Sequence, residues 1–465
     1  MRNDGVLKAV HGERFTPFAL ARKLNARVIL ESSSFQRGRE RYSILLVREA
    51  FRVYQQESNV FFSSGGTERK LPGGRGDLLE WLRYFAGQHR PLHLDLPLPA
   101  GGIGYLSYEF AAFCDTIRMR NGEDELGLPL GIFLFGHIFI IFDHYTDILY
   151  IIGLNYDEHE IDLPAAITET EQRINDLDFN YLARRQQDYP AELLRREKED
   201  ELFLAGVAAV RQEVIKGNLL QGVLSRRLRI KTELPPMDAY KNLRSANPSP
   251  YLFYLDFTTF QLFGASPEVH VKVKDGKAVI RPIAGTRRRG ASAEEDAAME
   301  KELLEDEKER AEHLMLVDLA RNDLGRVCTA GTVKMGEFMG IEHYSHVMHI
   351  VSEAEGTLAK GKTGADVIRA TFPAGTVSGA PKIRAAETIS ALEAHPRSFY
   401  AGLLGYMEPE GNLDTCITIR SACKKDGIIY LQAGAGIVYD SVPERELEET
   451  NEKLRALGSA VGVEV

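Results

Sequence analysis

The longest apolar run, "GIFLFGHIFIIFDHYTDILYIIGL", covers residues 131–154 and sets the strongest limit on how this chain folds. A membrane-spanning helix needs about 20 uninterrupted apolar residues. Here His137, Asp143, His144 and Asp147 interrupt the run. The pattern therefore predicts two buried strands joined by the turn "DHYTD", and we expect no membrane span.

Composition indicates an ordinary globular protein with material for a large core. The 465 residues are 44% hydrophobic and 27% charged, and length alone suggests two to four domains. The net charge of -10 argues against nucleic acid or an acidic membrane as the main partner. The N-terminus has no apolar core typical of a signal peptide. The four cysteines show no metal-ligand spacing, which argues against zinc or disulfides and fits a cytoplasmic protein: Cys114, Cys328, Cys416 and Cys423.

Two regions differ in their patterning. Residues 1–185 contain short β-like runs separated by polar turns, whereas residues 186–465 alternate strands with long helices. We expect helices near 199–217, 292–326 and 443–458, and a boundary within the polar segment "YLARRQQDYPAE". Antiparallel-looking strands with separate helices predict an α+β fold, with an N-terminal domain (1–185) and a catalytic domain (186–465).

Acidic residues recur at helical spacing in two places. Glu305, Glu309 and Glu312 lie at i, i+4 and i+7, and Glu446 and Glu449 lie at i and i+3. Such pairs on two helices can bind Mg²⁺, which takes one or two carboxylates together with water and substrate oxygens. A solvated acidic face has the same spacing, and the pattern alone leaves both interpretations open.

Three small-residue turns could bring backbone N–H groups against an anion: "PIAGT" (282–286), "PAGTVSGAPK" (373–382) and "LQAGAGIVYD" (431–440). Arg287 follows the first turn, and Arg420 and Lys453 lie near other candidate segments. The turns suit a small polyanion, but they lack the spacing of a nucleotide-triphosphate loop. Ordinary tight turns are the alternative.

Two titratable residues are candidates for proton transfer. His349 alternates with apolar residues, which is typical of a buried structural histidine and also of a general base on a strand beside a site. Glu268, beside Pro267, could be a proton donor with a raised pKa or an ordinary surface group.

Taken together, the segments resemble the chorismate-utilising enzymes, and within them the aminase components of anthranilate synthases. The resemblance runs almost continuously from Lys198 to Val465, and more weakly through "ILESSSFQRGRERYS" and "GGIGYLSYE". Its motifs are "SPE", "PIAGTRRRG", "DEKERAEHLMLVDLARNDLGRV", "YSHVMH", "FPAGTVSGAPKIRA", "GLLGYM", "DTCITIRSA", "QAGAGIVYDSVPERE" and "ETNEK".

The resemblance implies an anthranilate-synthase-like fold of large, mostly antiparallel sheets covered by helices. It implies a lyase that converts chorismate and ammonia to anthranilate and pyruvate for tryptophan biosynthesis. Mg²⁺ would be held by Glu309, Glu312, Glu446 and Glu449. The catalytic residues would be Glu268, His349 and Thr376. The chorismate site would comprise Gly285, Thr286, Tyr400, Arg420, Gly434, Ala435, Gly436 and Lys453.

Two positions separate this chain from its relatives. Aminodeoxychorismate synthases usually carry a lysine where Ala284 stands, and isochorismate and salicylate synthases carry one where Gln221 stands. Both differences favour ammonia as the nucleophile. An aminodeoxyisochorismate synthase shares many of these motifs and stays an alternative, as does a catalytically silent sensor of chorismate or tryptophan.

The resemblance also implies regulation and a partner. "LES" and "NPSPYLF" are similar to the two walls of a tryptophan feedback site, to which Leu30, Glu31, Ser32, Pro250, Tyr251 and Leu252 would contribute. A strand end and an ordinary proline turn are the alternative. The chain lacks the "GxCxG" elbow of a glutamine amidotransferase. We therefore expect ammonia from a separate glutaminase subunit in a hetero-oligomer.

Overall fold

The apolar run forms a buried β-hairpin, as predicted. The computed structural model describes residues 5–33, 41–92, 94–120, 122–176, 189–343 and 347–465. Strand β7 (Gly131–Asp143) pairs antiparallel with β8 (Ile148–Gly153) and with β3 (Tyr42–Gln56). Every residue of β7 is buried, which explains why its sequence is apolar without alternation. Among the described helices, none has the length and apolarity needed to cross a membrane.

The N-terminal part is built mainly from strands. Its other strands are β1 (Val6–His11), β2 (Val28–Glu31), β4 (Asn59–Ser64), β5 (Thr67–Lys70) and β6 (Ile103–Leu106). Its helices are α1 (Pro17–Leu24), α2 (Leu78–Ala86) and α3 (Leu163–Asn175), with the 3₁₀ turns η1 (Gly73–Arg75) and η2 (Tyr108–Phe113).

The rest of the chain mixes strands with longer helices. The strands are β9 (Ala191–Leu194), β10 (Gln221–Thr232), β11 (Tyr251–Asp256), β12 (Gln261–Ser266), β13 (Val269–Lys274), β14 (Lys277–Ile280), β15 (Ile283–Arg288), β16 (Lys334–Met335), β17 (Gly340–His343), β18 (Val347–Val351), β19 (Ala354–Thr357), β20 (Gly379–Ala380), β21 (Leu403–Met407), β22 (Leu413–Ile417), β23 (Ser421–Lys425) and β24 (Ile428–Ile437). The helices are α4 (Arg196–Ile215), α5 (Pro236–Ala246), α6 (Ala293–Glu305), α7 (Glu307–Gly325), α8 (Gly364–Thr371), α9 (Lys382–Leu392) and α10 (Pro443–Val461), with η4 (Gly375–Val377) and η5 (Pro409–Gly411).

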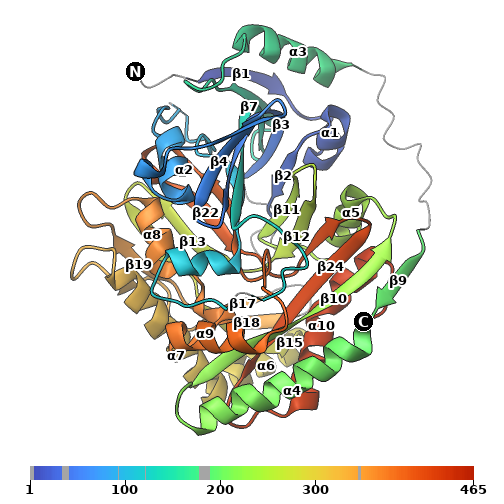
Figure 1. Cartoon of the computed structure of the whole chain (residues 1–465), viewed down its shortest axis with the longest axis vertical. Coiled ribbons are helices and arrows are strands. Elements are labelled where there is room, and N and C mark those ends of the chain that lie inside the picture. Colours follow the sequence, from blue (N-terminus) through green and yellow to red (C-terminus); the bar gives the residue numbers. More distant parts are fainter. Residues whose placement is uncertain (1–4, 34–40, 93, 121, 177–188, 344–346) are drawn as a thin grey trace.

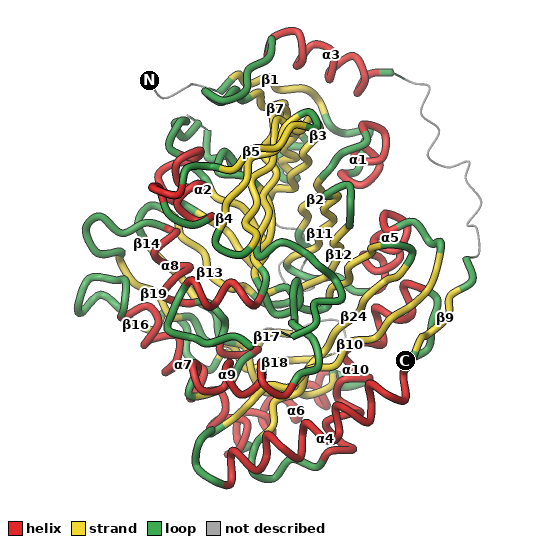
Figure 2. Tube along the Cα trace, in the orientation of Figure 1, coloured by secondary structure: helices red, strands yellow, loops and turns green. Residues whose placement is uncertain are grey.

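Hydrogen bonding joins 21 described strands into one sheet system, and β15, β18 and β17 form a separate sheet. The strand pairings are antiparallel. With helices α4, α9 and α10 packed against the long strands β10 and β24, the predicted α+β fold is confirmed (Figures 1 and 2).

Strands from both predicted domains pair with each other. β2 pairs with β11, and β6 pairs with β21. The predicted boundary after residue 185 lies within 177–188, outside the described residues. The division into two domains therefore stays a prediction.

The single helix expected over 292–326 is wrong, because it is two helices that meet at Asp306. The Asp306 carboxylate accepts hydrogen bonds from the backbone N–H groups of Lys308 and Glu309, at 3.0 and 3.1 Å, and so caps α7. Glu305 ends α6. It therefore does not continue the acidic face that Glu309 and Glu312 share on α7.

The pairing of β6 with β7 requires a glycine. At Gly104 a Cβ atom would lie 1.9 Å from the carbonyl oxygen of Ile132 and 2.7 Å from Cα of Phe133. Backbone atoms in a paired strand cannot move aside without breaking the ladder, so only glycine fits at this register.

We predict that Gly104→Ala lowers the free energy of unfolding by about 3 kcal/mol or more, because the added methyl group overpacks the β6–β7 pair. Urea denaturation measures this change. Gly325→Ala is the matched control, since Gly325 is exposed at the end of α7 and an added Cβ meets nothing within 4 Å. Equal stability of the two variants would contradict the close approach.

Candidate active site

Four carboxylates predicted to bind metal come from two helices and lie close enough to influence one another. Burial raises the pKa of Glu312 on α7, and the charges of Glu309 and Glu449 raise it further. Burial also raises the pKa of Glu446 on α10, with a further contribution from Glu449. The structure therefore brings these acidic groups of α7 and α10 together.

Cations and an amide hold three of these carboxylates. Lys453 Nζ lies 2.6 Å from Oε1 of Glu449, and Arg287 Nη1 donates to Oε1 of Glu309 at 2.9 Å. Gln221 Nε2 donates to Oε1 of Glu312 at 3.1 Å. Within the described ranges, no three His, Cys, Asp or Glu side chains form a group ready to hold a metal ion.

The donor set nevertheless fits Mg²⁺. All four candidate groups offer carboxylate oxygens, the ligands that this ion prefers, and it needs only one or two of them from the protein. The raised pKa values of Glu312 and Glu446 reflect burial and mutual repulsion, which a divalent cation would relieve.

The glycine-rich part of β24 exposes its backbone next to these acids. Gly434, Ala435 and Gly436 pair with Ser225, Leu224 and Val223 of β10. A Cβ atom at position 436 would lie 2.5 Å from Nε2 of Gln221, the side chain that binds Glu312. That amide ends a flexible side chain and can move, whereas a Cβ atom at position 434 would lie 2.7 Å from the Leu224 carbonyl oxygen, so glycine is required at Gly434.

His349 and the first small-residue turn face each other across two strands. Thr286 of β15 is the register partner of His349 on β18, at a bulge that places Gly285 at a φ of +73°. His349 Nδ1 lies 3.1 Å from the Gly285 carbonyl oxygen and 3.0 Å from Thr286 Oγ1. The carbonyl can only accept a hydrogen bond, so Nδ1 carries the proton and Nε2 is the basic nitrogen.

Burial has opposite effects on the two candidate proton carriers. It lowers the pKa of His349, although the Gly285 carbonyl opposes the shift, so the imidazole stays neutral near pH 7. It raises the pKa of Glu268 to about 7, against the effects of Thr376 and Lys453. Near pH 7 the structure therefore offers a neutral imidazole that can accept a proton and a carboxyl that is about half protonated.

The hydroxyl group of Thr376 is buried without an evident hydrogen-bond partner in the described part of the chain. By ordinary hydrogen-bond geometry its Oγ1 has no partner among the described residues, although it lies near enough to Glu268 to lower the pKa of that carboxyl. An unpaired buried hydroxyl costs about 1–3 kcal/mol, which a bound ligand could remove.

The predicted cationic and aromatic residues complete the group. Lys453 Nζ donates to the Gly434 carbonyl oxygen at 2.8 Å, and Arg420 Nη1 donates to the Lys453 carbonyl oxygen at 2.8 Å. Burial raises the pKa of Tyr400 to about 12, while the charge of Arg420 opposes this. Burial lowers the pKa of Arg420, and Tyr400 and Glu449 oppose that shift. All predicted chorismate-site and metal-site residues thus belong to one connected region.

The family model for chorismate binding enzymes matches residues 33–459. The chain belongs to this family. Anthranilate synthase component 1 of Spirochaeta aurantia is 59% identical over 464 residues, covering 99% of this chain and 96% of that relative. The crystal structure of anthranilate synthase component I from Streptococcus pneumoniae TIGR4 gives a TM-score of 0.80 at 34% identity, covering 90% of this chain and 92% of that one.

A more distant member shares the fold alone. The menaquinone-specific isochorismate synthase from Escherichia coli is 17% identical with a TM-score of 0.74, covering 98% of this chain and 94% of that one. This chorismate-binding fold therefore tolerates extensive sequence change.

Sequence analysis missed groups that support the site rather than line it. Lys382 follows the turn that contains Thr376, and its Nζ lies 2.6 Å from Oδ2 of Asp323. The buried Arg397 pairs with Glu393. Lys382 and Asp323 are far apart in sequence, so no local spacing predicts their contact, whereas Glu393 and Arg397 stand at i and i+4.

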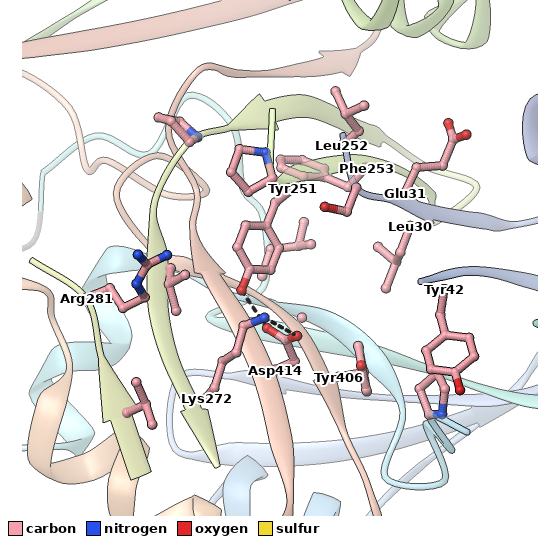
Figure 3. Close-up of a pocket in the computed structure, with 18 of the residues that line it drawn as sticks. Leu30, Glu31, Tyr42, Tyr251, Leu252, Phe253, Lys272, Arg281, Tyr406 and Asp414 are labelled. Carbon is pink, nitrogen blue, oxygen red and sulfur yellow. Dashed lines mark hydrogen bonds and ion pairs between the residues drawn. The ribbon is translucent and has the colours of Figure 1, made fainter. Parts of the chain in front are cut away.

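The predicted tryptophan residues line a separate cavity of about 950 Å³ (Figure 3). Leu30 and Tyr251 face this space, and Tyr251 donates to Oδ1 of Asp414 at 2.6 Å. Their strand neighbours Glu31 and Leu252 point the other way, as successive strand residues do.

Glu31 and Ser32, two further residues predicted to contact tryptophan, differ in whether their side chains have hydrogen-bond partners. Glu31 accepts hydrogen bonds from Tyr240 and Arg244, at 2.8 and 2.7 Å, so its carboxylate is engaged on the far side of the strand. Ser32 Oγ is buried without a hydrogen-bond partner in the described part of the chain. Pro250 also lines the cavity.

The raised pKa of Glu268 predicts a pH-dependent effect on stability. Between about pH 4.5 and 7 the folded state keeps a proton that the unfolded chain has lost, so this carboxyl makes the fold less stable as pH rises. Glu268→Gln removes the effect. Its unfolding free energy, measured with urea and compared with the native chain, should rise between pH 5 and pH 8 by up to about 3 kcal/mol.

Glu408→Gln is the matched control, because burial raises the pKa of this carboxyl to about 7 as well. Glu408 binds the backbone N–H of Leu98 and is none of the candidate site residues. It should show the same trend in stability without loss of activity. A Glu268→Gln effect that does not change with pH would contradict the proposed ionisation.

Proposed function

We propose that this protein is component 1 of an anthranilate synthase and converts chorismate and ammonia to anthranilate and pyruvate. The observation that carries the proposal is the Glu268 carboxyl, whose pKa burial raises to about 7, together with His349, whose Nδ1 is held by the Gly285 carbonyl. Ala284 and Gln221 support it, because lysine-dependent relatives use those positions. The relatives at 59% and 34% identity share this name.

The residues suit two proton transfers. Ammonia adds at C2 of chorismate while the C4 hydroxyl takes a proton from Glu268 and leaves as water. The basic Nε2 of His349 then accepts the C2 proton as the bond from C3 to the enolpyruvyl oxygen breaks. The ring becomes aromatic, and the enolpyruvate that leaves takes up a proton at its methylene carbon to form pyruvate.

The anionic substrate requires local positive charge in an acidic protein. Arg420 and Lys453 supply fixed cations, and Gly434 and Gly436 leave β24 without side chains at those two positions. Glu309, Glu312, Glu446 and Glu449 would hold Mg²⁺. When bound, the ion would neutralise developing charge on the ring carboxylate.

The other parts of the proposal concern supply and control. A separate glutamine amidotransferase subunit would provide ammonia, in keeping with the "component 1" names of the relatives. Tryptophan would bind the 950 Å³ cavity as a feedback inhibitor. The unpaired Ser32 hydroxyl could bind a charged group of that ligand. A reducing cytoplasm is the expected compartment.

Product identity tests the central proposal. With chorismate, Mg²⁺ and ammonium at alkaline pH, the purified chain should form fluorescent anthranilate, and chelation of the metal should stop it. Glutamine alone should not replace ammonium. Accumulation of aminodeoxychorismate, aminodeoxyisochorismate or isochorismate would reject the assignment.

We predict that His349→Ala lowers anthranilate formation by about a hundredfold or more, because removal of a positioned base costs at least that much. An amino-diene intermediate should accumulate and be detectable by chromatography. His395→Ala is the control, since His395 contacts a backbone carbonyl at Glu123 instead. Normal anthranilate output from the His349 variant would remove the assigned role.

We predict that Ser32→Ala raises the tryptophan concentration for half-inhibition about tenfold, because one hydrogen bond to a charged group is lost. Anthranilate fluorescence at several tryptophan concentrations measures the shift. Ser245 is exposed on α5, so Ser245→Ala should leave inhibition by tryptophan unchanged. Unaltered inhibition in the Ser32 variant would place tryptophan elsewhere.

A further inference from the structure

Thr376 lies on a short turn, residues 374–378, that is closely packed on both sides. Ser378 Oγ donates to the Ala374 carbonyl oxygen at 2.8 Å, and the Ser378 N–H donates to the Gly375 carbonyl oxygen at 3.1 Å. A Cβ atom at Gly375 would lie 1.8 Å from Cδ2 of Leu319 on α7. The turn therefore has little room to move against α7.

A buried lysine fixes the N-terminal side of this turn. Lys382 Nζ, at the start of α9, lies 2.6 Å from Oδ2 of Asp323 on α7. The same nitrogen donates to the Thr371 carbonyl oxygen at 3.0 Å, at the end of α8. Both charged side chains are less than a tenth exposed, at 9% and 8%. One cation thus joins three helices where the chain enters the turn.

A buried arginine fixes the other side. Arg397 Nη1 donates to the Val377 carbonyl oxygen at 2.6 Å, directly after Thr376. Its Nη2 donates to the Val223 carbonyl oxygen of β10 at 2.5 Å. Glu393 accepts from the same guanidinium at 2.7 and 2.9 Å, and the two side chains are 1% and 6% exposed.

We propose that Lys382 and Arg397 are positioning residues that hold Thr376 beside Glu268. Arg397 acts through the Val377 carbonyl within the turn, and Lys382 acts through the Thr371 carbonyl just before it. The turn itself contains no charged residue, and the Arg397 bond to Val377 adds a charged donor to the neutral bonds that Tyr108 and Val223 make with Ser378. The proposal rests on the proposed function only for the catalytic use of Thr376.

A double-mutant cycle separates positioning from general structural support. Thr376→Ala and Lys382→Met should each lower kcat/KM, by about tenfold or more. If Lys382 acts through Thr376, the double variant should be no worse than Thr376→Ala, within about threefold, because coupled residues are non-additive. Losses that multiply would overturn the proposal. The same cycle with Arg397→Lys tests the second cation, since lysine keeps the charge but loses the planar fork.

Matched controls exclude a general effect of removing buried cations. Lys424 also donates to two backbone carbonyls, of Thr232 and Leu234, at 2.7 and 2.8 Å, and Lys424→Met should keep activity. Arg229→Lys is the corresponding control for Arg397, since Arg229 is buried and paired with Glu125 and Glu199.

Two provisions keep the test decisive. If the Lys382→Met variant does not fold, Asp323→Asn takes its place in the cycle. This substitution weakens the ion pair between Lys382 and position 323, while Lys382 can still donate to the Thr371 carbonyl. A native chain that turns over no chorismate would reject the proposed function. The cycle is then measured on chorismate affinity by calorimetry, where the same non-additivity is expected and multiplying losses overturn the positioning role.

Discussion

The antiparallel pairing of β10 with β24 is the constraint on which the candidate site depends. It sets Gly434–Gly436 beside the start of β10, where Gln221 meets Glu312 of α7. The chain then turns into α10, which brings Glu449 and Lys453 back to the same place. A shift of the register by one residue would move the glycines away from Gln221, put side chains in their place, and separate the acids from the backbone they flank.

Burial is the physical cause that prepares the site for acid–base chemistry. Water would favour the ionised forms of both a carboxyl and an imidazole. Removing it raises the pKa of Glu268 to about 7 and lowers that of His349, so near pH 7 about half of the Glu268 carboxyl keeps its proton while the imidazole is neutral. One can then donate a proton and the other can accept one, which is the combination that the proposed reaction needs.

The cavity proposed for tryptophan lies against strands that carry candidate catalytic residues. Its lining includes Pro267, next to Glu268, and Ile283, at the start of the strand that carries Thr286. An occupant that shifts this wall would therefore act on backbone segments of the catalytic group. Because the cavity and the candidate active site share these strands, tryptophan could affect chorismate turnover without touching chorismate.

Sequence alone determined the elements and the chemical groups, while tertiary structure decided how they are used. The apolar run predicted the β7–β8 hairpin because its period and its interruptions are local properties. The capping of α7 by Asp306 was missed, since helical spacing continues across the break between α6 and α7. The motifs identified Glu268, His349 and the acids of α7 and α10, but the sequence left a raised pKa of Glu268 as one of two alternatives, because burial by distant segments decides it. The contacts of Lys382 and Arg397 with Asp323 and Val223 were not predicted, although Lys382 lies within a quoted motif, because these partners meet only after the chain has folded.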